Sequence, residues 1–183
     1  MKIAQRALRA QPFHAMSIGA RARELESRGI RIAKLSLGEP SFGAPPGVHE
    51  AMRATMDGRA LPYTPAAGLP ALRRAVAGLY RTRHGVDVDP RRVLITAGAS
   101  AGLLLATALT TEAGDDVVMA DPCYPCNREL VDTFGGRVVL APTTPAARYQ
   151  LDLATALAAW TERTSAVQVA TPSNPTGTTI PFP

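Results

Sequence analysis

The stretch DDVVMADPCYPCNRELVDTFGGRVVLAP, residues 115–142, contains two apolar runs that flank an amphipathic segment of helical length. We predict strands over DDVVMA and RVVLAP and a helix over CNRELVDTFGG between them. The first run is apolar on both faces at Val117, Val118 and Met119, which is typical of a parallel strand covered by helices on both sides. The stretch therefore predicts a right-handed strand–helix–strand unit.

The same alternation of strand and helix patterns continues on both sides of this unit. It predicts strands over RRVLIT (residues 91–96) and TSAVQVA (164–170), and helices over GASAGLLLATALT (98–110) and LDLATALAAW (151–160). Toward the N-terminus, the predicted elements are helices at 17–28, 48–58 and 68–85 and an extended run at 30–37. The helix at 68–85 carries its apolar residues on one face, at Leu69, Leu72, Val76, Leu79 and Tyr80. The whole pattern predicts an α/β fold, a three-layer α/β/α arrangement with a mostly parallel sheet.

Composition places the chain among ordinary globular proteins. Of its 183 residues, 46% are hydrophobic and 19% are charged, and no run approaches the roughly 20 apolar residues of a membrane helix. We therefore expect a soluble protein with no membrane partner. The two cysteines and the lack of a secretory signal pattern make the cytoplasm the expected compartment.

A net charge of +5 raises the question of nucleic-acid binding. The arginines are scattered as singles and pairs, without a basic stripe, and aromatic residues that could stack on bases make up only 5% of the chain. We therefore expect no nucleic-acid partner.

In open α/β sheets, ligands bind beyond the carboxyl ends of the strands, so the residues that follow each predicted strand are candidate site residues. After VLIT, Gly98 permits a tight turn, and the N–H groups of Ala99 and Ser100 open a helix, which suits an anion such as phosphate. Close packing of small residues is the alternative. The segment is neither a P-loop nor a complete dinucleotide fingerprint, but Asp121 stands where a ribose-binding acid would, so a Rossmann-type nucleotide site stays open.

The second predicted strand is followed by DPCYPCN, residues 121–127. Tyr124 lies between two prolines, where its ring could lie flat on a planar ligand or simply cap the core. Cys123 and Cys126 form a C-x-x-C pair, but the chain offers no second pair of ligands close in sequence. We expect neither a metal site nor redox chemistry here.

The last predicted strand is followed by TPSNPTG, residues 171–177. The prolines fix the backbone, Gly177 allows a turn, and Asn174 presents a short amide that can donate a hydrogen bond to a phenolate-type oxygen. An ordinary turn is the alternative for any single Asn-Pro pair.

Taken together, these segments resemble the class I and II aminotransferases of pyridoxal-phosphate fold type I. The likeness runs through LSLGEPSFGAPPGVHEAM, YTPAAGLPALRRAVA, ITAGASAG, DPCYPCN and SNPTG, in that order. It implies the large domain of a pyridoxal-phosphate-dependent transferase in incomplete form, with pyridoxal 5'-phosphate as cofactor.

The resemblance also implies roles for individual residues. Ala99 and Ser100, after Gly98, would hold the cofactor phosphate, and Tyr124 would stack on the pyridine ring. Asn174 would bind the ring oxygen. Two further residues would act at other points: Gly38 near the substrate carboxylate, and Tyr63 at the cofactor phosphate of the partner subunit in a homodimer.

The function that follows is transfer of an amino group from an amino acid to a 2-oxo acid. The family's Schiff-base lysine lies beyond SNPTG, and the only lysines here are Lys2 and Lys34. We therefore predict an N-terminal fragment, inactive alone, with residues 1–45 as N-terminal arm and small-domain part and residues 46–183 as large-domain part. A truncated sheet would leave an apolar strand edge unpaired. The alternatives are a non-catalytic module that binds a phosphate ligand or a partner, and the nucleotide-binding domain that Asp121 suggests.

Overall fold

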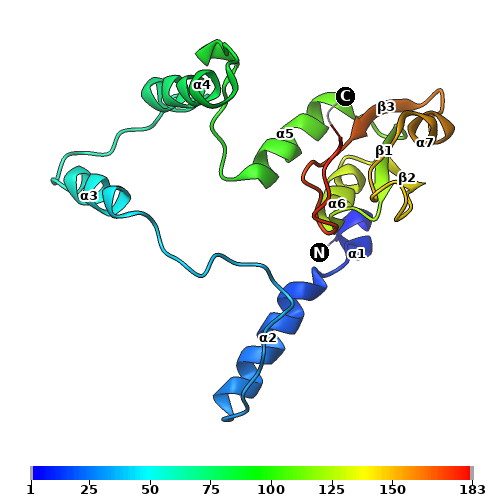
Figure 1. Ribbon diagram of the computed structural model, residues 1–183, viewed down its shortest axis with the longest axis horizontal. Coiled ribbons are helices and arrows are strands. Elements are labelled where there is room, and N and C mark those ends of the chain that lie inside the picture. Colours follow the sequence, from blue (N-terminus) through cyan, green and yellow to red (C-terminus); the bar gives the residue numbers. More distant parts are fainter. Residues whose placement is uncertain (1, 182–183) are drawn as a thin grey trace. The chain divides into compact units, whose positions relative to one another are not determined.

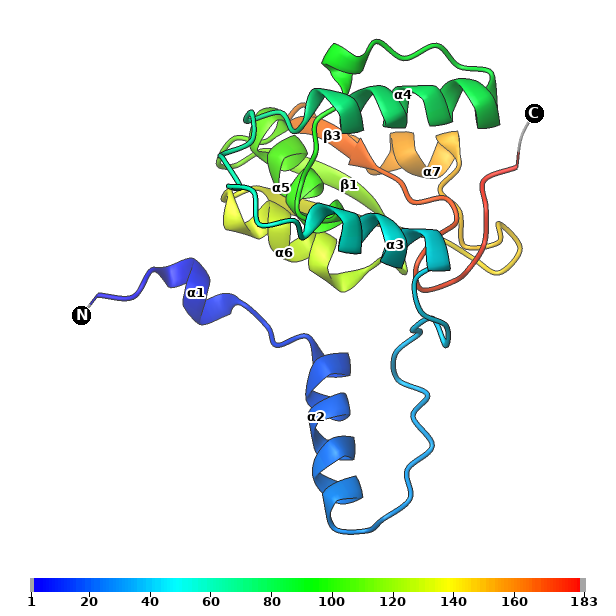
Figure 2. The ribbon, with the colours of Figure 1, turned by 90° about the vertical axis from the view of Figure 1, so that its left-hand side faces the viewer.

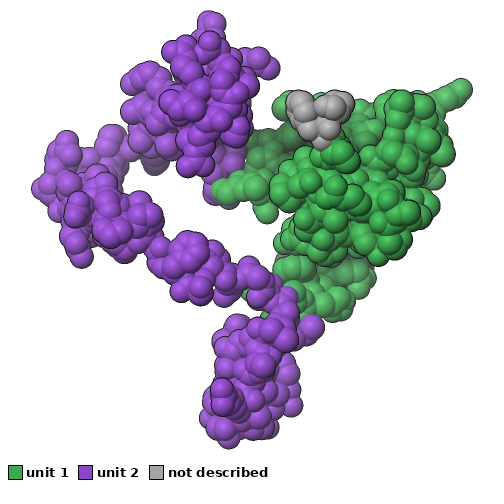
Figure 3. All heavy atoms as spheres, in the orientation of Figure 1, with its two compact units in different colours: residues 1–17, 98–183 green, residues 18–97 purple. Residues whose placement is uncertain are grey.

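A computed structural model describes residues 2–181 of the chain (Figure 1). The chain forms two compact units (Figure 3), one made of residues 1–17 and 98–183 and the other of residues 18–97. We call them the sheet unit and the helical unit. The boundary at residue 45 that the sequence suggested stays a prediction.

The sheet unit contains three parallel strands in the order β2-β1-β3. Their bounds are Asp116–Asp121 for β1, Arg137–Pro142 for β2 and Thr164–Gln168 for β3. In the central register, Val118 of β1 pairs with Val139 on one side and Val167 on the other. The prediction of a parallel α/β sheet is confirmed.

Helices connect and cover the strands. The chain crosses from β1 to β2 through α6 (Pro125–Thr133) and returns from β2 to β3 through α7 (Leu153–Ala158). Because right-handed crossovers in opposite directions lie on opposite faces, α6 and α7 cover opposite sides of the sheet (Figure 2). Helix α5 (Ala99–Thr110) packs beside α6, and α1 (Gln5–Arg9) also belongs to the sheet unit.

The core surrounds the central strand. Val117, Val118 and Met119 are buried on both faces of β1, as their pattern predicted, and Val131 of α6 packs against Val117 and Met119. At Gly136, just before β2, a Cβ would lie 2.6 Å from Thr111 Cγ2 and 2.9 Å from Val131 Cγ1. The junction between α6 and β2 therefore requires a residue without a side chain.

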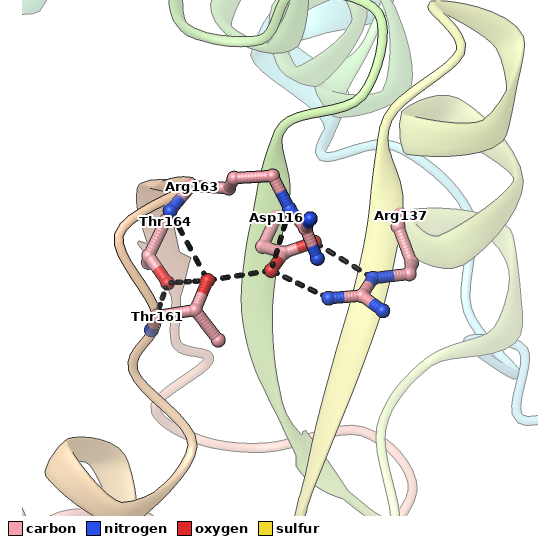
Figure 4. Close-up of polar contacts among 5 residues, drawn as sticks. All are labelled: Asp116, Arg137, Thr161, Arg163 and Thr164. Atoms are coloured by element: carbon pink, nitrogen blue, oxygen red, sulfur yellow. Dashed lines mark hydrogen bonds and ion pairs between the residues drawn. The ribbon is translucent and has the colours of Figure 1, made fainter.

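A polar network closes the amino-terminal end of the sheet (Figure 4). The Asp116 carboxylate, at the start of β1, is fully buried. It accepts hydrogen bonds from Arg137 Nε and Nη2, each at 2.7 Å, and from Thr161 Oγ1 at 2.6 Å. Arg163 Nε lies 3.8 Å away. One buried carboxylate thus joins β1, β2 and the turn before β3.

The helical unit consists mainly of helices and loops. Its elements are most of α2 (His14–Ser27), α3 (Pro46–Thr55), α4 (Pro70–His84) and the short 3-10 helix η1 (Pro90–Arg92). Helix α4 ends at Gly85, whose φ of 65° is the left-handed conformation typical of a helix C-cap. Arg73 Nε of α4 donates to the Val93 carbonyl at 2.8 Å, which ties the helix to the segment after η1. The apolar face predicted for α4 stays partly exposed, with Leu72 at 45% and Leu79 at 45%.

The predicted strand over residues 91–96 is wrong. Residues 90–92 form η1, whose N-cap Asp89 accepts a hydrogen bond from the Arg91 N–H at 2.8 Å. Residues 93–96 pair with no strand of the described chain, and the Ile95 N–H donates to the Ala67 carbonyl at 3.1 Å. A β-strand forms only when it makes hydrogen bonds to a neighbouring strand, and an apolar run in the sequence does not identify that neighbour. The extended run predicted over residues 30–37 contains no strand, and residues 36 and 37 form a bend.

Within residues 2–181, no helix has both the length and the apolar character needed to cross a membrane.

Candidate functional site

A pocket lies at the carboxyl edge of the sheet, where three loops of the sheet unit meet. It is lined by residues from the end of β1 and the loop after it, from the loop before α7, and from β3 and the loop after it. Tyr124 and Asn174, two residues that the sequence singled out separately, both line it. Parallel strands bring their following loops to one edge, which is why residues 50 positions apart meet here.

Tyr124 is positioned by its backbone and by an aromatic neighbour. It is the N-cap of α6, with extended φ and ψ, and Pro125 occupies the first helical position. The ring of Phe13, from the N-terminal segment, meets the Tyr124 ring edge to face, with centroids 5.8 Å apart and an angle of 74°. The hydrogen bond with Cys126, together with partial burial, raises the pKa of the Tyr124 hydroxyl. Tyr124 is therefore a neutral, half-buried ring in the pocket wall.

Of the two cysteines beside Tyr124, Cys123 lies in surroundings that indicate a packing role. Cys123 packs against the core cluster of Val117, Met119 and Val131, and burial raises the pKa of its thiol. A raised pKa disfavours the thiolate that redox or metal chemistry needs. The described residues contain no group of three or more His, Cys, Asp or Glu side chains that could hold a metal ion.

Asn174 lies in a tightly closed turn. The Ser173 N–H donates to the Thr178 carbonyl at 2.8 Å, and the Gly177 N–H donates to the Ser173 carbonyl at 2.7 Å. Gly177 has a φ of 67°, which a residue with a side chain rarely adopts, and the Asn174–Pro175 peptide bond is cis. The turn leaves the Asn174 side chain exposed at the pocket.

The third predicted element, the N-terminus of α5, is open to solvent. Gly98 precedes the helix with a φ of 83°, and Ala99 and Ser100 are exposed in its first turn. N–H groups in a first turn have no carbonyl partner within their helix. Helix α5 ends shortly before β1 starts, and Leu103 and Val169 line one hollow between helix and sheet. The helix thus runs back along the sheet, and its N-terminus is directed toward the carboxyl edge.

Gly38 and Tyr63 belong to the helical unit and do not line this pocket. Gly38 lies in the exposed segment between α2 and α3, and Tyr63 lies between α3 and α4 with its side chain fully exposed. Their predicted roles stay predictions.

Three residues of the site were not predicted from the sequence: Phe13, Tyr149 and Gln150. Phe13 is an isolated aromatic in the N-terminal segment, and nothing in its surroundings indicates contact with residue 124. Tyr149 and Gln150 line the pocket from the loop before α7. Their position depends on a left-handed backbone at Arg148 and Tyr149, each with a φ of 55°. An Arg or a Tyr in the sequence does not indicate such a backbone conformation.

The chemistry of these residues suits a planar aromatic ligand that bears a ring oxygen and a phosphate. Tyr124 offers a neutral aromatic surface, Asn174 offers an amide N–H, and the first turn of α5 offers backbone N–H groups and the Ser100 hydroxyl. Asp121 is the exposed last residue of β1, and its carbonyl accepts hydrogen bonds from the Thr143 N–H and hydroxyl.

Comparisons with known proteins place the chain in a family. The family model described as aminotransferase class I and II matches residues 30–183. A valine–pyruvate aminotransferase of Mycobacterium tuberculosis is 43% identical over 170 residues, which are 93% of this chain and 44% of that protein. A probable aspartate/prephenate aminotransferase of Thermus aquaticus is 34% identical over 98% of this chain and 47% of its own length.

Solved structures show the same likeness. A crystal structure of an aminotransferase from Mycobacterium tuberculosis superposes with a TM-score of 0.92 at 41% identity, over 99% of this chain and 46% of that one. Aspartate aminotransferase from Thermus thermophilus with maleate gives 0.90 at 31% identity, over 96% of this chain and 46% of that one. The chain spans somewhat less than half the length of the relatives it matches.

Proposed function

This chain belongs to the class I and II aminotransferase family, and on that premise we propose that it forms the cofactor-binding part of an enzyme that transfers an amino group from an amino acid to a 2-oxo acid. The cofactor in this proposal is pyridoxal 5'-phosphate. The observation that carries it is the meeting of Tyr124 and Asn174 in one pocket at the carboxyl edge of the sheet. The family assignment favours this function over the nucleotide-binding alternative that rests on Asp121 alone.

When bound, pyridoxal phosphate supplies a conjugated ring that takes up the electrons released at the substrate α-carbon. The residues of this chain would bind and orient that ring. Tyr124 would pack on its face, held by Phe13, and Asn174 would donate its amide N–H to the ring oxygen. The N–H groups of Ala99 and Ser100, which follow Gly98, would donate hydrogen bonds to the phosphate at the N-terminus of α5.

Two residues of the helical unit have proposed roles toward substrate and subunit. We assign Gly38 to the region of the substrate carboxylate and Tyr63 to the cofactor phosphate of a second subunit in a homodimer. The full exposure of the Tyr63 side chain supports this role, because a residue that serves a neighbouring subunit has to be accessible on its own. We place the enzyme in the cytoplasm, where free cysteines such as Cys123 and Cys126 persist.

The proton transfer at the substrate α-carbon needs a basic group, which a lysine supplies in this family. Lys2 lies in the N-terminal segment, and Lys34 Nζ forms an ion pair with Glu26 Oε2 at 2.8 Å in the helical unit. Neither lysine lies in the sheet unit's pocket. We therefore propose that residues 1–183 bind the cofactor without a covalent link and do not transaminate by themselves.

The test is a fluorescence titration of the chain with pyridoxamine 5'-phosphate, which carries the ring, the ring oxygen and the phosphate but needs no lysine. We expect saturable binding that weakens about fivefold in Tyr124→Ala, because stacking on an aromatic ring contributes about 1 kcal/mol. Tyr80→Ala is the matched control, since Tyr80 lies on α4 in the helical unit.

Two results would overturn the proposal. One is the absence of saturable binding of pyridoxamine phosphate. The other is tighter binding of NAD that disappears in Asp121→Ala, which would support a nucleotide-binding domain. Measurable transamination by the purified 183-residue chain would refute the proposed dependence on a lysine outside it.

A further inference from the structure

Gln150 is a buried polar residue next to the pocket, and its side chain is bound to the turn that carries Asn174. Only 7% of Gln150 is exposed. Its Nε2 donates to the Thr178 carbonyl at 2.8 Å and lies 2.7 Å from Thr178 Oγ1. A buried amide with both contacts on one residue is a specific attachment, because a buried donor without a partner is costly.

Thr178 is the residue that closes the turn. Its carbonyl also accepts the Ser173 N–H at 2.8 Å, and its hydroxyl lies 2.9 Å from Thr176 Oγ1. The turn from 173 to 178 is therefore anchored at the oxygens that Gln150 contacts. Among the hydrogen bonds of the described residues, Gln150 provides the one side chain from outside residues 171–180 that holds this turn.

The loop that presents Gln150 adopts a backbone that its residues disfavour. Arg148 and Tyr149 both have a φ of 55°, in the left-handed region that residues with a side chain enter at a cost. Hydrogen bonds hold this conformation: the Tyr149 N–H donates to the Thr144 carbonyl at 2.9 Å, and the Gln150 N–H donates to the Ala147 carbonyl at 3.0 Å. Strained backbone of this kind persists where the surroundings fix it, and it concentrates at functional sites.

We propose that Gln150 is a positioning residue for the cofactor site. It fixes Thr178, and through the closed turn it sets the orientation from which Asn174 donates to the ring oxygen. The inference rests on the proposed function, because the ring oxygen belongs to the cofactor assigned there. It extends that function to a residue that touches neither the ring nor the phosphate.

The test uses Gln150→Leu, which keeps the approximate volume of the side chain and removes the donor. Two probes are titrated by fluorescence: pyridoxamine 5'-phosphate and its 3-deoxy analogue, which lacks the ring oxygen. We expect Gln150→Leu to weaken binding of the first probe about tenfold, the loss typical of one hydrogen bond, and to leave binding of the analogue within about twofold.

The role is further defined by a comparison with Asn174→Ala. That variant should show the same probe dependence, and the double variant should bind no more weakly than Asn174→Ala alone, because both changes remove one interaction. Gln11→Leu is the matched control: Gln11 Nε2 also donates to a backbone carbonyl, that of Arg9 at 3.1 Å, outside the pocket. It should bind both probes as the unchanged chain does.

Hydrogen exchange provides a readout that does not need a ligand. The amides of Ser173 and Gly177 should exchange about tenfold faster in Gln150→Leu, while those of Val117, Val118 and Met119 stay protected. Equal weakening of both probes, or loss of protection in β1, would reduce Gln150 to a structural residue and overturn the proposal.

Unchanged binding of both probes in Gln150→Leu would also overturn it, with the proposed function intact. An unchanged chain that binds neither probe would instead overturn the proposed function, and the positioning role with it.

Discussion

Asp116 shows at the scale of one residue how this chain tolerates a charge in its core. The carboxylate is fully buried, which by itself would raise its pKa. The hydrogen bonds from Arg137, followed by the one from Thr161, outweigh burial and lower the pKa of Asp116 to about 2. A buried charge survives here because each carboxylate oxygen has a donor, and the loss of either partner would leave it uncompensated.

This lowered pKa predicts an acid-dependent stability. A carboxyl with a folded-state pKa below its unfolded value stabilises the fold above about pH 4, and the contribution is lost as the pH falls toward 2. We expect Asp116→Asn to lower the thermal unfolding midpoint at pH 7 by roughly 5 °C or more. The difference between variant and unchanged chain should shrink steadily from pH 4 to pH 2, as followed by circular dichroism.

Asp152→Asn serves as the comparison, because Asp152 also has a lowered pKa but caps the exposed start of α7 through the Thr155 N–H. It should have a smaller effect on the unfolding midpoint. A midpoint difference for Asp116→Asn that does not change between pH 7 and pH 2 would contradict the assignment.

At the residue scale, the sequence predicted the parts of the site that follow strands and missed those placed by tertiary contacts. Tyr124 and Asn174 could be predicted because strand ends meet at one edge. The sequence could not predict Phe13, because its position depends on an aromatic contact with a residue more than 100 positions away. It could not predict Tyr149 and Gln150 either, because they depend on a backbone conformation that Arg and Tyr rarely adopt.

At the scale of elements, the start of α4 depends on a close approach at Gly68. This residue has a φ of 95°, and a Cβ on it would lie 2.4 Å from Ile95 Cγ1 and 2.5 Å from Ile95 Cβ. The loop before α4 and the segment after η1 therefore pack against each other through a position that accepts only glycine. The Ala67 carbonyl, which binds the Ile95 N–H, completes this contact.

Two glycine substitutions in the same unit should have opposite effects. Gly68→Ala adds both left-handed strain and steric overlap, so we expect it to lower the free energy of unfolding by about 3 kcal/mol. Gly78→Ala lies inside α4 with no atom within 4 Å of the new Cβ, and it should raise the free energy of unfolding by about 0.5 to 1 kcal/mol. Urea denaturation measures both, and equal effects would show that Ile95 does not pack against Gly68.

Strand prediction succeeded for the three apolar runs that pair with one another as β1, β2 and β3, and it failed for the run that pairs with no strand of the described chain. The β1–α6–β2 unit lies within 30 residues, and its strands pair with each other. The run at 91–96 has the composition of a strand, yet composition does not specify what pairs with it, and Asp89 and Pro90 start a 3-10 helix at its beginning. The predicted helices needed no such information, because their caps and periodicity are local, whereas the short helix α1 was not predicted.

At the scale of the whole molecule, the edge of the sheet at β3 is the exposed feature of most consequence. No strand of the described chain pairs with the outer side of β3, and Val167 and Val169 are 37% and 52% exposed. They line a hollow with Leu103 and Ala106 of α5. Open edges with apolar side chains are templates for pairing with other chains.

We expect the 183-residue chain to self-associate as its concentration rises, and Val167→Lys to reduce this association at least severalfold. A lysine on an edge strand opposes pairing by charge and by desolvation. Light scattering against concentration measures the effect. Thr133→Lys adds the same charge at an exposed position of α6 and should leave the association unchanged. Equal effects of the two variants would show that the reduced association comes from the net charge and not from the edge of β3.

The strand order has a consequence for how the chain is made. The central strand β1 pairs first with β2, which follows it directly, and receives its second neighbour only when β3 has been synthesised. Between Pro142 and Thr164, translation at about 5 to 20 residues per second leaves one side of the most buried strand open for roughly 1 to 4 s. During that interval the nascent chain leaves one edge of β1, along Val117, Val118 and Met119, without its second neighbouring strand, and a chaperone that binds nascent chains would find an apolar segment there.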